Sequence, residues 1–344
     1  MDRVLLTGAN GHLGFNLVKL LVERGYRVRA GVRSLLDPAK TDHLRPLGVE
    51  LVEADLDRPA TLAAAAAGTD GVFHVAAPVR MIADDPEREI VEPTVRGGLE
   101  MLRAARTAGV KKVVFTSSIA AVGVTCARDR CLTEDDWNTT AEHPYIRAKT
   151  EAEKAAWAFA RHSGLNLVVI NPGTILGPGF HRHTPSTELA AMILRRRPPV
   201  ALPFGSCYVD ARDAARAHLL AYENPAAAGR YLAVNGPFVP MAELMRLVHQ
   251  SEPSVRADPV VLPGWVLQGV VLWDWLGHVL LGRARRLTRP MLREFARTYV
   301  CFSHAKATRE LGWEPMDFGR SVADTVAWIR ERSPTPRSDR PGSP

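Results

Sequence analysis

The stretch Val4-Leu5-Leu6-Thr7-Gly8-Ala9-Asn10-Gly11-His12-Leu13-Gly14 constrains the fold of this chain more than any other. Its apolar start predicts a buried strand, three glycines follow at a three-residue spacing, and an apolar segment from Leu13 to Val22 predicts a helix. Glycine lets the backbone approach a pyrophosphate with no Cβ in the way, and the N-terminus of a helix favours anions. A strand, a glycine turn and a helix in this order predict a βαβ unit that binds a dinucleotide.

Strands and helices alternate through the first half of the chain. Further strands are expected over 27–31, 49–54, 71–75, 111–115 and 165–170, and helices over 61–67, 87–108 and 144–162. Later segments are expected to form helices over 210–222, 242–248 and 320–330 and a strand over 230–234. This alternation predicts an α/β fold with a doubly wound parallel sheet of the Rossmann type.

A basic residue follows the second expected strand. In a dinucleotide-binding fold this position meets the adenosine ribose, where an acidic residue favours NAD and a basic residue favours the 2′-phosphate of NADP. Because Arg33 stands there, with Lys40 nearby, we predict NADP(H) as the cofactor and NAD(H) as the alternative. Asp55, after the third strand, could accept a hydrogen bond from adenine or cap the helix that starts near Pro59.

Tyr145 and Lys149 stand four residues apart on one expected helix, so that both side chains share a face. A tyrosine has a reference pKa near 10, and a neighbouring ammonium would lower that pKa. Such a tyrosine can protonate a carbonyl oxygen as hydride reaches the carbon. A hydroxyl of Ser117 or Ser118, at the end of the fifth strand, could bond the same oxygen.

Taken together, these motifs resemble an extended short-chain dehydrogenase/reductase of the NAD-dependent epimerase/dehydratase type. The matching features are Thr7-Gly8-x-x-Gly11-x-x-Gly14, Asp55-Leu56, Thr116-Ser117-Ser118, Tyr145-x-x-x-Lys149 and Asn171-Pro172-Gly173. Within the family, the chain is most similar to the dihydroflavonol reductase and aldehyde/ketone reductase branch, with the 3β-hydroxysteroid dehydrogenases as close relatives.

The resemblance implies a role for each matching residue. Tyr145 would be the general acid, Lys149 would lower its pKa and hold the nicotinamide ribose, and Ser118 rather than Ser117 would orient the carbonyl. The expected cofactor-binding residues are Gly8, Asn10, Gly11, His12, Leu13, Gly14, Arg33, Lys40, Asp55, Leu56, Val75, Ala76, Ala77, Tyr145, Lys149, Pro172, Gly173 and Thr174. No metal site is expected.

These roles lead to one main functional hypothesis and several alternatives. The main hypothesis is NADPH-dependent reduction of a ketone or aldehyde on an apolar, ring-bearing substrate of flavonoid, steroid or polyketide type. One alternative is a nucleotide-sugar epimerase or dehydratase, whose substrate diphosphate Arg182, Arg195 and Arg212 could bind. Oxidation of the 3β-hydroxysteroid dehydrogenase type is another, and a nucleotide sensor without catalysis is a third.

The same reading divides the chain into regions. We expect residues 1–174 to form the NADP-binding domain, with 210–235 returning to it, and 175–332 to form a smaller, mostly helical substrate-binding region. The segment 333–344 contains mainly proline, serine and charged residues and is expected to be a disordered tail. The sequence leaves the choice between a monomer and a homodimer open.

Charge and cysteine content indicate which binding partners and which cellular compartment to expect. The net charge of +7 is not concentrated beside aromatic residues, so no nucleic-acid partner is expected. The four cysteines, at 126, 131, 207 and 301, show neither metal-ligand spacing nor a disulfide framework, which fits a reducing cytoplasm. The first strand begins too close to Met1 to leave room for a signal peptide.

The most apolar segment runs from Leu262 to Leu281 and carries Trp265, Trp273 and Trp275, and the arginines within 282–286 follow it. Asp274 near its middle argues against a membrane-spanning helix. Three interpretations stay open: a lid over an apolar pocket, a helix packed in the core, and a peripheral contact with a membrane surface.

Overall fold

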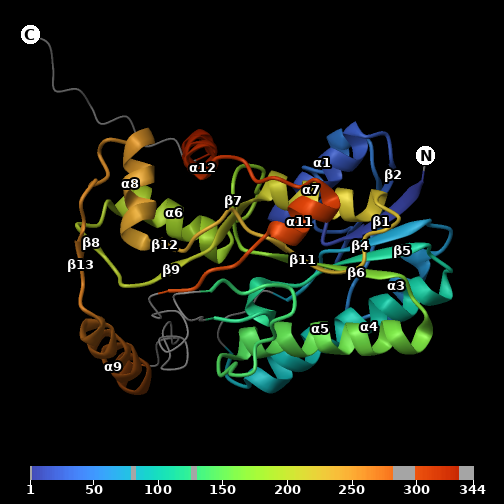
Figure 1. Cartoon of the computed structure of the whole chain (residues 1–344), viewed down its shortest axis with the longest axis horizontal. Helices are drawn as coiled ribbons and strands as arrows, with labels where there is room; N and C mark the ends of the chain where they lie inside the picture. The colour runs from blue at the N-terminus through green and yellow to red at the C-terminus, as the bar shows by residue number, and fades with distance from the viewer. Residues whose placement is uncertain (1, 79–82, 125–129, 282–298, 333–344) are drawn as a thin grey trace, which may run out of the picture.

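The computed structural model describes residues 2–78, 83–124, 130–281 and 299–332. The predictions for Cys126, for 282–286 and for the tail at 333–344 concern residues outside these ranges. Two parts are visible in Figure 1: a layered sheet domain, and a smaller region built from the middle and the end of the chain.

Seven strands of the described residues form a parallel sheet in the order β11-β6-β5-β4-β1-β2-β3. The strands are β1 (Arg3–Thr7), β2 (Arg27–Val32), β3 (Glu50–Glu53), β4 (Gly71–His74), β5 (Lys112–Thr116), β6 (Leu167–Pro172) and β11 (Gly229–Ala233). The order reverses between β1 and β4, and ligands of such sheets bind at this point, beyond the carboxyl ends of the strands. The predicted doubly wound sheet is confirmed.

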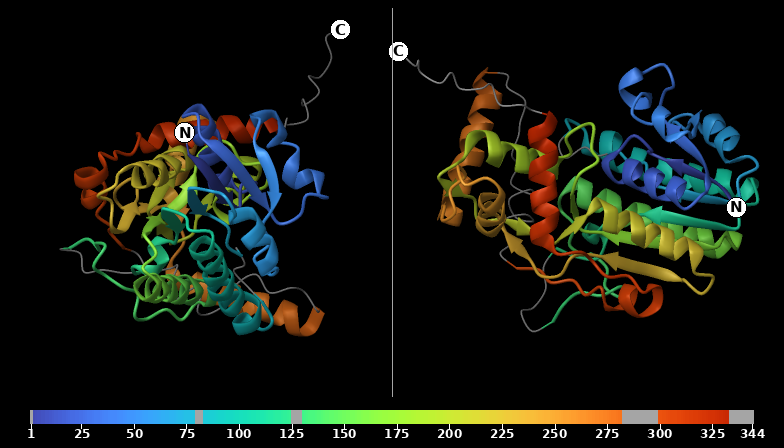
Figure 2. Two further views of the ribbon diagram at one scale, coloured as in Figure 1. Left: turned by 90° about the vertical axis from the view of Figure 1, so that its right-hand side faces the viewer. Right: turned by 90° about the horizontal axis from the view of Figure 1, so that it is seen from above.

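Helices cover both faces of the sheet because successive strand side chains point to opposite sides. Val4 and Leu6 pack in one core with α1 (His12–Glu23) and α7 (Ala211–Glu223), whereas Leu5 belongs to the opposite core. That second core lies under α3 (Pro59–Ala66), α4 (Glu92–Thr107) and α5 (Pro144–Ser163). Figure 2 shows the helices on either side of the sheet.

Short elements complete the sheet domain. They are α2 (Pro38–Thr41), the helical turns η1 (Arg45–Leu47), η2 (Glu87–Val91) and η3 (Ile119–Ala121), and α11 (Ala305–Leu311). The helix expected over 87–108 is divided into the π-helical turn η2 and α4. Pro93 accounts for the position of this division, because it lacks an N–H and is tolerated only in the first turn of a helix.

The smaller region packs three helices around a core of its own. These are α6 (Pro185–Arg196), α8 (Met241–Ser251) and α12 (Phe318–Arg332). Three two-stranded pairs join them: β7 (Thr174–Leu176) with β10 (Tyr208–Asp210), β8 (Val200–Ala201) with β13 (Val260–Val261), and β9 (Gly205–Ser206) with β12 (Val239–Pro240).

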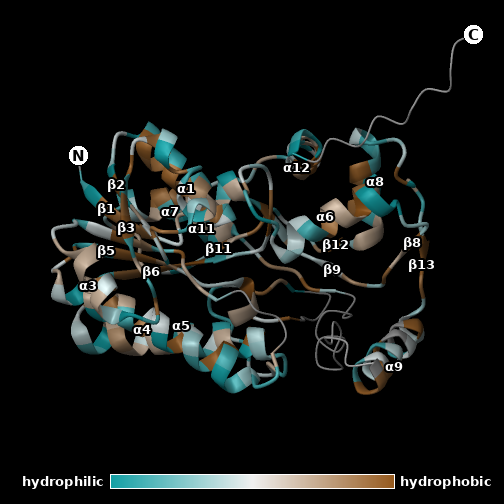
Figure 3. Cartoon of the chain, turned by 180° about the vertical axis from the view of Figure 1, so that it is seen from behind, coloured by the Kyte–Doolittle hydropathy of each residue, from teal (hydrophilic) through white to brown (hydrophobic). Residues whose placement is uncertain are grey.

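The apolar segment forms α9 (Gly264–Leu281), at the periphery of the molecule (Figure 3). Trp265 and Trp273 have 73% and 76% of their surface exposed, whereas Val271 has 5% exposed. The interpretation as a helix packed in the core is therefore wrong for the described side chains. No described helix is long and apolar enough to cross a membrane.

A disulfide contradicts the expectation that the cysteines form no framework. Cys131 and Cys301 are bonded across a sequence separation of 170 residues. The backbone pairs at the same place, because Leu132 N donates to the carbonyl of Cys301 at 2.7 Å and Ser303 N donates to the carbonyl of Leu132 at 2.9 Å. The spacing of the cysteines carried no signal for this bond, since it depends on how two distant segments meet in the fold.

Candidate active site

A cavity of about 780 Å³ opens at the carboxyl ends of the sheet strands. One side is lined by the loops that follow β1, β2, β4, β5 and β6 and by the start of α5, and the other side by the smaller region. All the expected site residues line this cavity except Asp55. The structure thus brings segments from residue 8 to residue 302 around one space.

The glycine turn forms the floor of the cavity at the end of β1. Gly8 has a φ of +72°, and a Cβ on Gly14 would lie 2.1 Å from the carbonyl oxygen of Gly8. No side chain fits at Gly14, because the first turn of α1 packs directly on this loop. A Cβ at Gly8 would lie 2.8 Å from the backbone nitrogen of Ala76. The bare backbone and the helix N-terminus make a cradle that fits a pyrophosphate.

Three basic side chains line one end of the cavity: Arg33, Lys40 and Arg182. Lys40 Nζ lies 2.9 Å from Asp37 Oδ2. The hydrogen bond from Lys40 and its positive charge hold the pKa of Asp37 below its usual range. Arg33 is exposed, with its Nε 4.0 Å from Asp55 Oδ1.

Asp55 itself organises the turn before α3. Its Oδ1 accepts from the backbone nitrogen of Asp57 at 3.2 Å, and its Oδ2 accepts from Arg58 Nε at 3.2 Å. The carboxylate therefore contacts neighbouring residues of its own loop and does not line the cavity.

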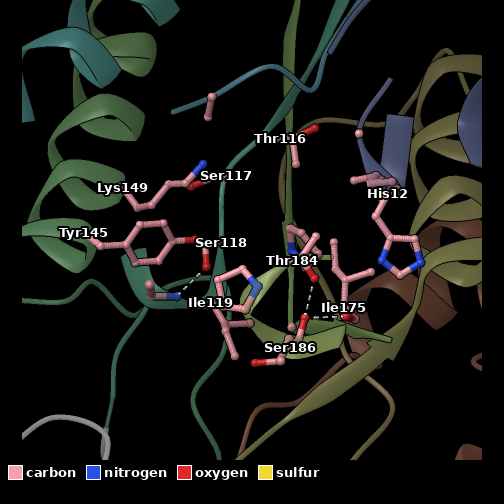
Figure 4. Close-up of a pocket in the computed structure, with 18 of the residues that line it drawn as sticks. His12, Thr116, Ser117, Ser118, Ile119, Tyr145, Lys149, Ile175, Thr184 and Ser186 are labelled. Carbon is pink, nitrogen blue, oxygen red and sulfur yellow. Dashed lines mark hydrogen bonds between the residues drawn. The ribbon is translucent and has the colours of Figure 1, made fainter. Parts of the chain in front are cut away.

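Tyr145 and Ser118 both line the cavity, and their side chains lie next to each other (Figure 4). α5 starts beside Tyr145, since Pro144 occupies its first turn and His143 Nδ1 accepts from Tyr145 N at 3.2 Å. Burial raises the pKa of Tyr145, and a hydrogen bond from Ser118 opposes this rise. Burial is thus the larger of these two effects on the pKa of Tyr145, and the lowering of that pKa by Lys149 stays a prediction.

Lys149 lies one turn further along α5 and points toward Ser117 (Figure 4). Burial lowers the pKa of Lys149 to about 8, and the nearby carboxylate of Glu153 opposes this fall. His74, at the end of β4, is also buried, and burial together with the charge of Lys149 lowers its pKa to about 3. Lys149 is thus largely charged at neutral pH, and His74 is neutral.

Most of the remaining lining residues are apolar, and those from Ile175 to Phe302 belong to the other side of the cavity. The side chains of Phe204, Phe238 and Phe302 stand among aliphatic residues, and Ser186 Oγ donates to the carbonyl of Ile175 at 2.7 Å. These lining residues are Ile119, Gly123, Val124, Ile175, Thr184, Pro185, Ser186, Leu189, Leu202, Phe204, Gly205, Ser206, Tyr208, Phe238, Val300 and Phe302. They come from short segments without a periodic pattern, so the sequence carried no signal for them.

Behind the cavity lies a buried polar cluster that was not predicted from the sequence. It contains Glu153 and Arg230, whose side chains lie 2.6 Å apart between Oε1 and Nε. The spacing of four residues from Lys149 to Glu153 would have placed Glu153 on the same helix face. Nothing in the sequence ties Arg230 to it. Among the described residues, no group of three or more side chains could hold a metal ion.

Comparison with known proteins gives three kinds of match. Residues 4–235 match the model of the NAD dependent epimerase/dehydratase family. The chain is 42% identical to cinnamoyl-CoA reductase 1 of Arabidopsis thaliana over 243 residues, which cover 67% of this chain and 69% of that protein. It is 36% identical to dihydroflavonol 4-reductase of the same plant over 247 residues, covering 67% and 65%. The structure of Gre2 from Candida albicans in complex with NADPH superposes with a TM-score of 0.76, at 28% identity, over 96% of this chain and 99% of that one.

Proposed function

Since the chain belongs to the NAD dependent epimerase/dehydratase family and is an oxidoreductase of the extended short-chain dehydrogenase/reductase type, we propose that it uses NADPH to reduce a ketone or aldehyde on an apolar, ring-bearing substrate. One observation carries this proposal: Tyr145, Ser118 and Lys149 line the same cavity as the glycine turn. A proton donor and a dinucleotide cradle therefore share one space.

The side chains support a division of labour in the reaction. The bound cofactor supplies hydride to the carbonyl carbon. Tyr145 donates its hydroxyl proton to the carbonyl oxygen, and because burial raises the pKa of Tyr145, the hydroxyl holds this proton until it is needed. Ser118 Oγ orients the same oxygen. Lys149, charged at neutral pH, stabilises the phenolate that remains.

The cavity also supports the choice of NADPH over NADH. The cradle at Gly8 and Gly14 fits the pyrophosphate. Arg33 and Lys40, which stand after β2, would bind the 2′-phosphate, since guanidinium and ammonium groups are the usual partners of phosphate. The relative from Candida albicans was solved with NADPH.

The apolar side of the cavity supports an aromatic or otherwise ring-bearing substrate. Phe204, Phe238 and Phe302 offer ring faces and edges for stacking, and the plant relatives are named for cinnamoyl and dihydroflavonol compounds.

The nucleotide-sugar alternative finds limited support in the three arginines considered for it. Of the three arginines considered for a diphosphate, only Arg182 lines the cavity within the described residues. Arg195 pairs with Glu188 at 2.6 Å, and Arg212 pairs with Asp210 at 2.9 Å.

A peripheral contact with a membrane surface is a second part of the proposal. The exposed tryptophans of α9 support it, because indole rings favour the interface between water and lipid. None of the described residues of α9 lines the cavity, so the interpretation as a pocket lid has no support.

The decisive experiment compares Tyr145→Phe with the wild type on a panel of aryl ketones and aldehydes. We expect kcat with NADPH to fall by about 10²–10⁴-fold, since positioned acid catalysis contributes about that much, while the dissociation constant of NADPH stays within about twofold. Tyr26→Phe is the matched control, because the Tyr26 hydroxyl donates to Glu223 Oε1 and neither residue lines the cavity. Full turnover in Tyr145→Phe would contradict the proposed mechanism.

A further inference from the structure

We propose that Glu153 is a positioning residue for the proposed reduction: its buried carboxylate joins α5, which carries Lys149, to the strand ends that carry Ser117, Ser118 and Asn171. This inference rests on the proposed function for its catalytic consequence. Its structural basis is independent of the substrate.

The carboxylate of Glu153 is a junction between elements. The residue is fully buried on α5, and its Oε2 accepts from Ser117 Oγ at 2.5 Å and from Asn171 Nδ2 at 2.8 Å. The same amide of Asn171 donates to the carbonyl of Ser118 at 3.0 Å. Glu153 thereby reaches the proposed catalytic serine through one intermediate side chain, and it links α5 to the ends of β5 and β6.

A buried carboxylate is costly unless a cation compensates it. Arg230 on β11 supplies that cation, with its Nε 2.6 Å from Glu153 Oε1. Arg230 is held in turn by the carbonyls of Glu134 and Asp136, to which its Nη1 donates at 3.0 and 2.7 Å, and by the ring of Trp137 at 3.9 Å. These contacts fix the guanidinium beside the carboxylate of Glu153.

Glu153 also stands one helical turn after Lys149 on α5, on the same helix face. Three elements present titratable or charged groups here: Tyr145 and Glu153 on α5, His74 on β4, and Arg230 on β11 behind Glu153. Tyr145 keeps its proton because burial raises its pKa, and burial lowers the pKa of His74 to about 3. Glu153 is the group that raises the pKa of Lys149 against the effect of burial. Without its charge, the ammonium would lose its proton at a lower pH.

The test is Glu153→Gln, which keeps the shape of the side chain and removes its charge. We expect the alkaline limb of the pH profile of kcat/KM to move down by about one pH unit or more, as the loss of a nearby opposite charge implies. Competitive labelling with acetic anhydride, followed by mass spectrometry of the Lys149 peptide, should show the same shift without any turnover. Glu151→Gln is the control, since this exposed carboxylate lies on the same helix.

An unchanged alkaline limb and an unchanged labelling curve in folded Glu153→Gln would overturn the proposal. If that variant does not fold because Arg230 is left unpaired, Glu153→Gln with Arg230→Met removes both charges and makes the same comparison. If the wild type reduces no carbonyl compound, the proposed function fails, and the labelling curve alone then decides whether Glu153 sets the charge of Lys149.

Discussion

At the scale of single residues, the proposed catalytic pair was found in the sequence by its fixed spacing on one helix. Tyr145 and Lys149 lie one helical turn apart, and the cavity contains both. The local electrostatics were not predictable from that spacing. Burial raises the pKa of Tyr145, and Ser118 opposes the rise in the structure. The ion pair of Glu153 with Arg230 was not predicted, because it joins residues 77 positions apart in the sequence.

Arg33 provides a test of cofactor selection. We expect Arg33→Ala to weaken NADPH binding by about tenfold, the equivalent of about 1.4 kcal/mol, because the variant lacks the guanidinium that we propose binds the 2′-phosphate. NADH binding should change less than twofold, since NADH lacks this phosphate. Fluorescence titration of both cofactors measures the two constants.

Arg45→Ala is the matched control for this comparison. Arg45 is exposed and pairs with Asp42 at 3.5 Å, and it does not belong to the cavity lining. Equal losses of NADPH and NADH affinity in Arg33→Ala would argue against a phosphate contact.

At the scale of elements, strands and long helices followed their periodicity, whereas contacts between distant segments did not. The sheet strands lie where the alternation of strands and helices predicted them. α9 was ambiguous because apolar composition alone does not say whether a helix packs inside or outside. The disulfide between Cys131 and Cys301 depends on the pairing of Leu132 with Phe302, which no local pattern encodes.

α9 provides the prediction at this scale. We expect the double variant Trp265→Ser and Trp273→Ser to lose most of the binding of the full chain to phosphatidylcholine vesicles that contain anionic lipid, because two exposed indole rings would no longer enter the interface. Sedimentation with vesicles measures the bound fraction. Leu36→Ser removes an exposed apolar side chain, 93% accessible, from another part of the surface and serves as the control. Absence of vesicle binding by the wild type would refute the proposed membrane contact.

At the scale of the whole molecule, the architecture was largely predictable. A glycine turn, alternating elements and short connections admit few folds other than a doubly wound sheet. The substrate side was not predictable, because its wall is assembled from short segments between β7 and Phe302 that carry no repeating pattern.

Buried histidines make the stability of the whole molecule dependent on pH. Burial lowers the pKa of His12 and of His218 to about 4 and that of His74 to about 3. The unfolded chain therefore binds more protons than the folded chain between pH of about 6.5 and about 4, so stability is lost as the pH falls through this window. We expect the free energy of unfolding to drop by about 2 kcal/mol per histidine from pH 7 to pH 5.

Urea unfolding at several pH values measures this loss. His218→Gln should reduce the pH dependence, because one buried histidine no longer has to gain a proton on unfolding. His162→Gln, at an exposed position, should leave the dependence as it is. A flat stability curve between pH 7 and pH 5 in the wild type would show that these histidines do not govern acid sensitivity.

The division of the cavity between two parts of the chain bears on how such an enzyme diversifies. The proposed reducing residues stand at the end of β5 and on α5, whereas Phe204, Phe238 and Phe302 stand on short strands and loops outside the sheet. If the proposed function holds, we expect exchange of these rings to alter which molecules are accepted and to leave the transfer of hydride and proton intact. A duplicated gene can thus acquire a new selectivity through a few changes, with little cost to its inherited chemistry.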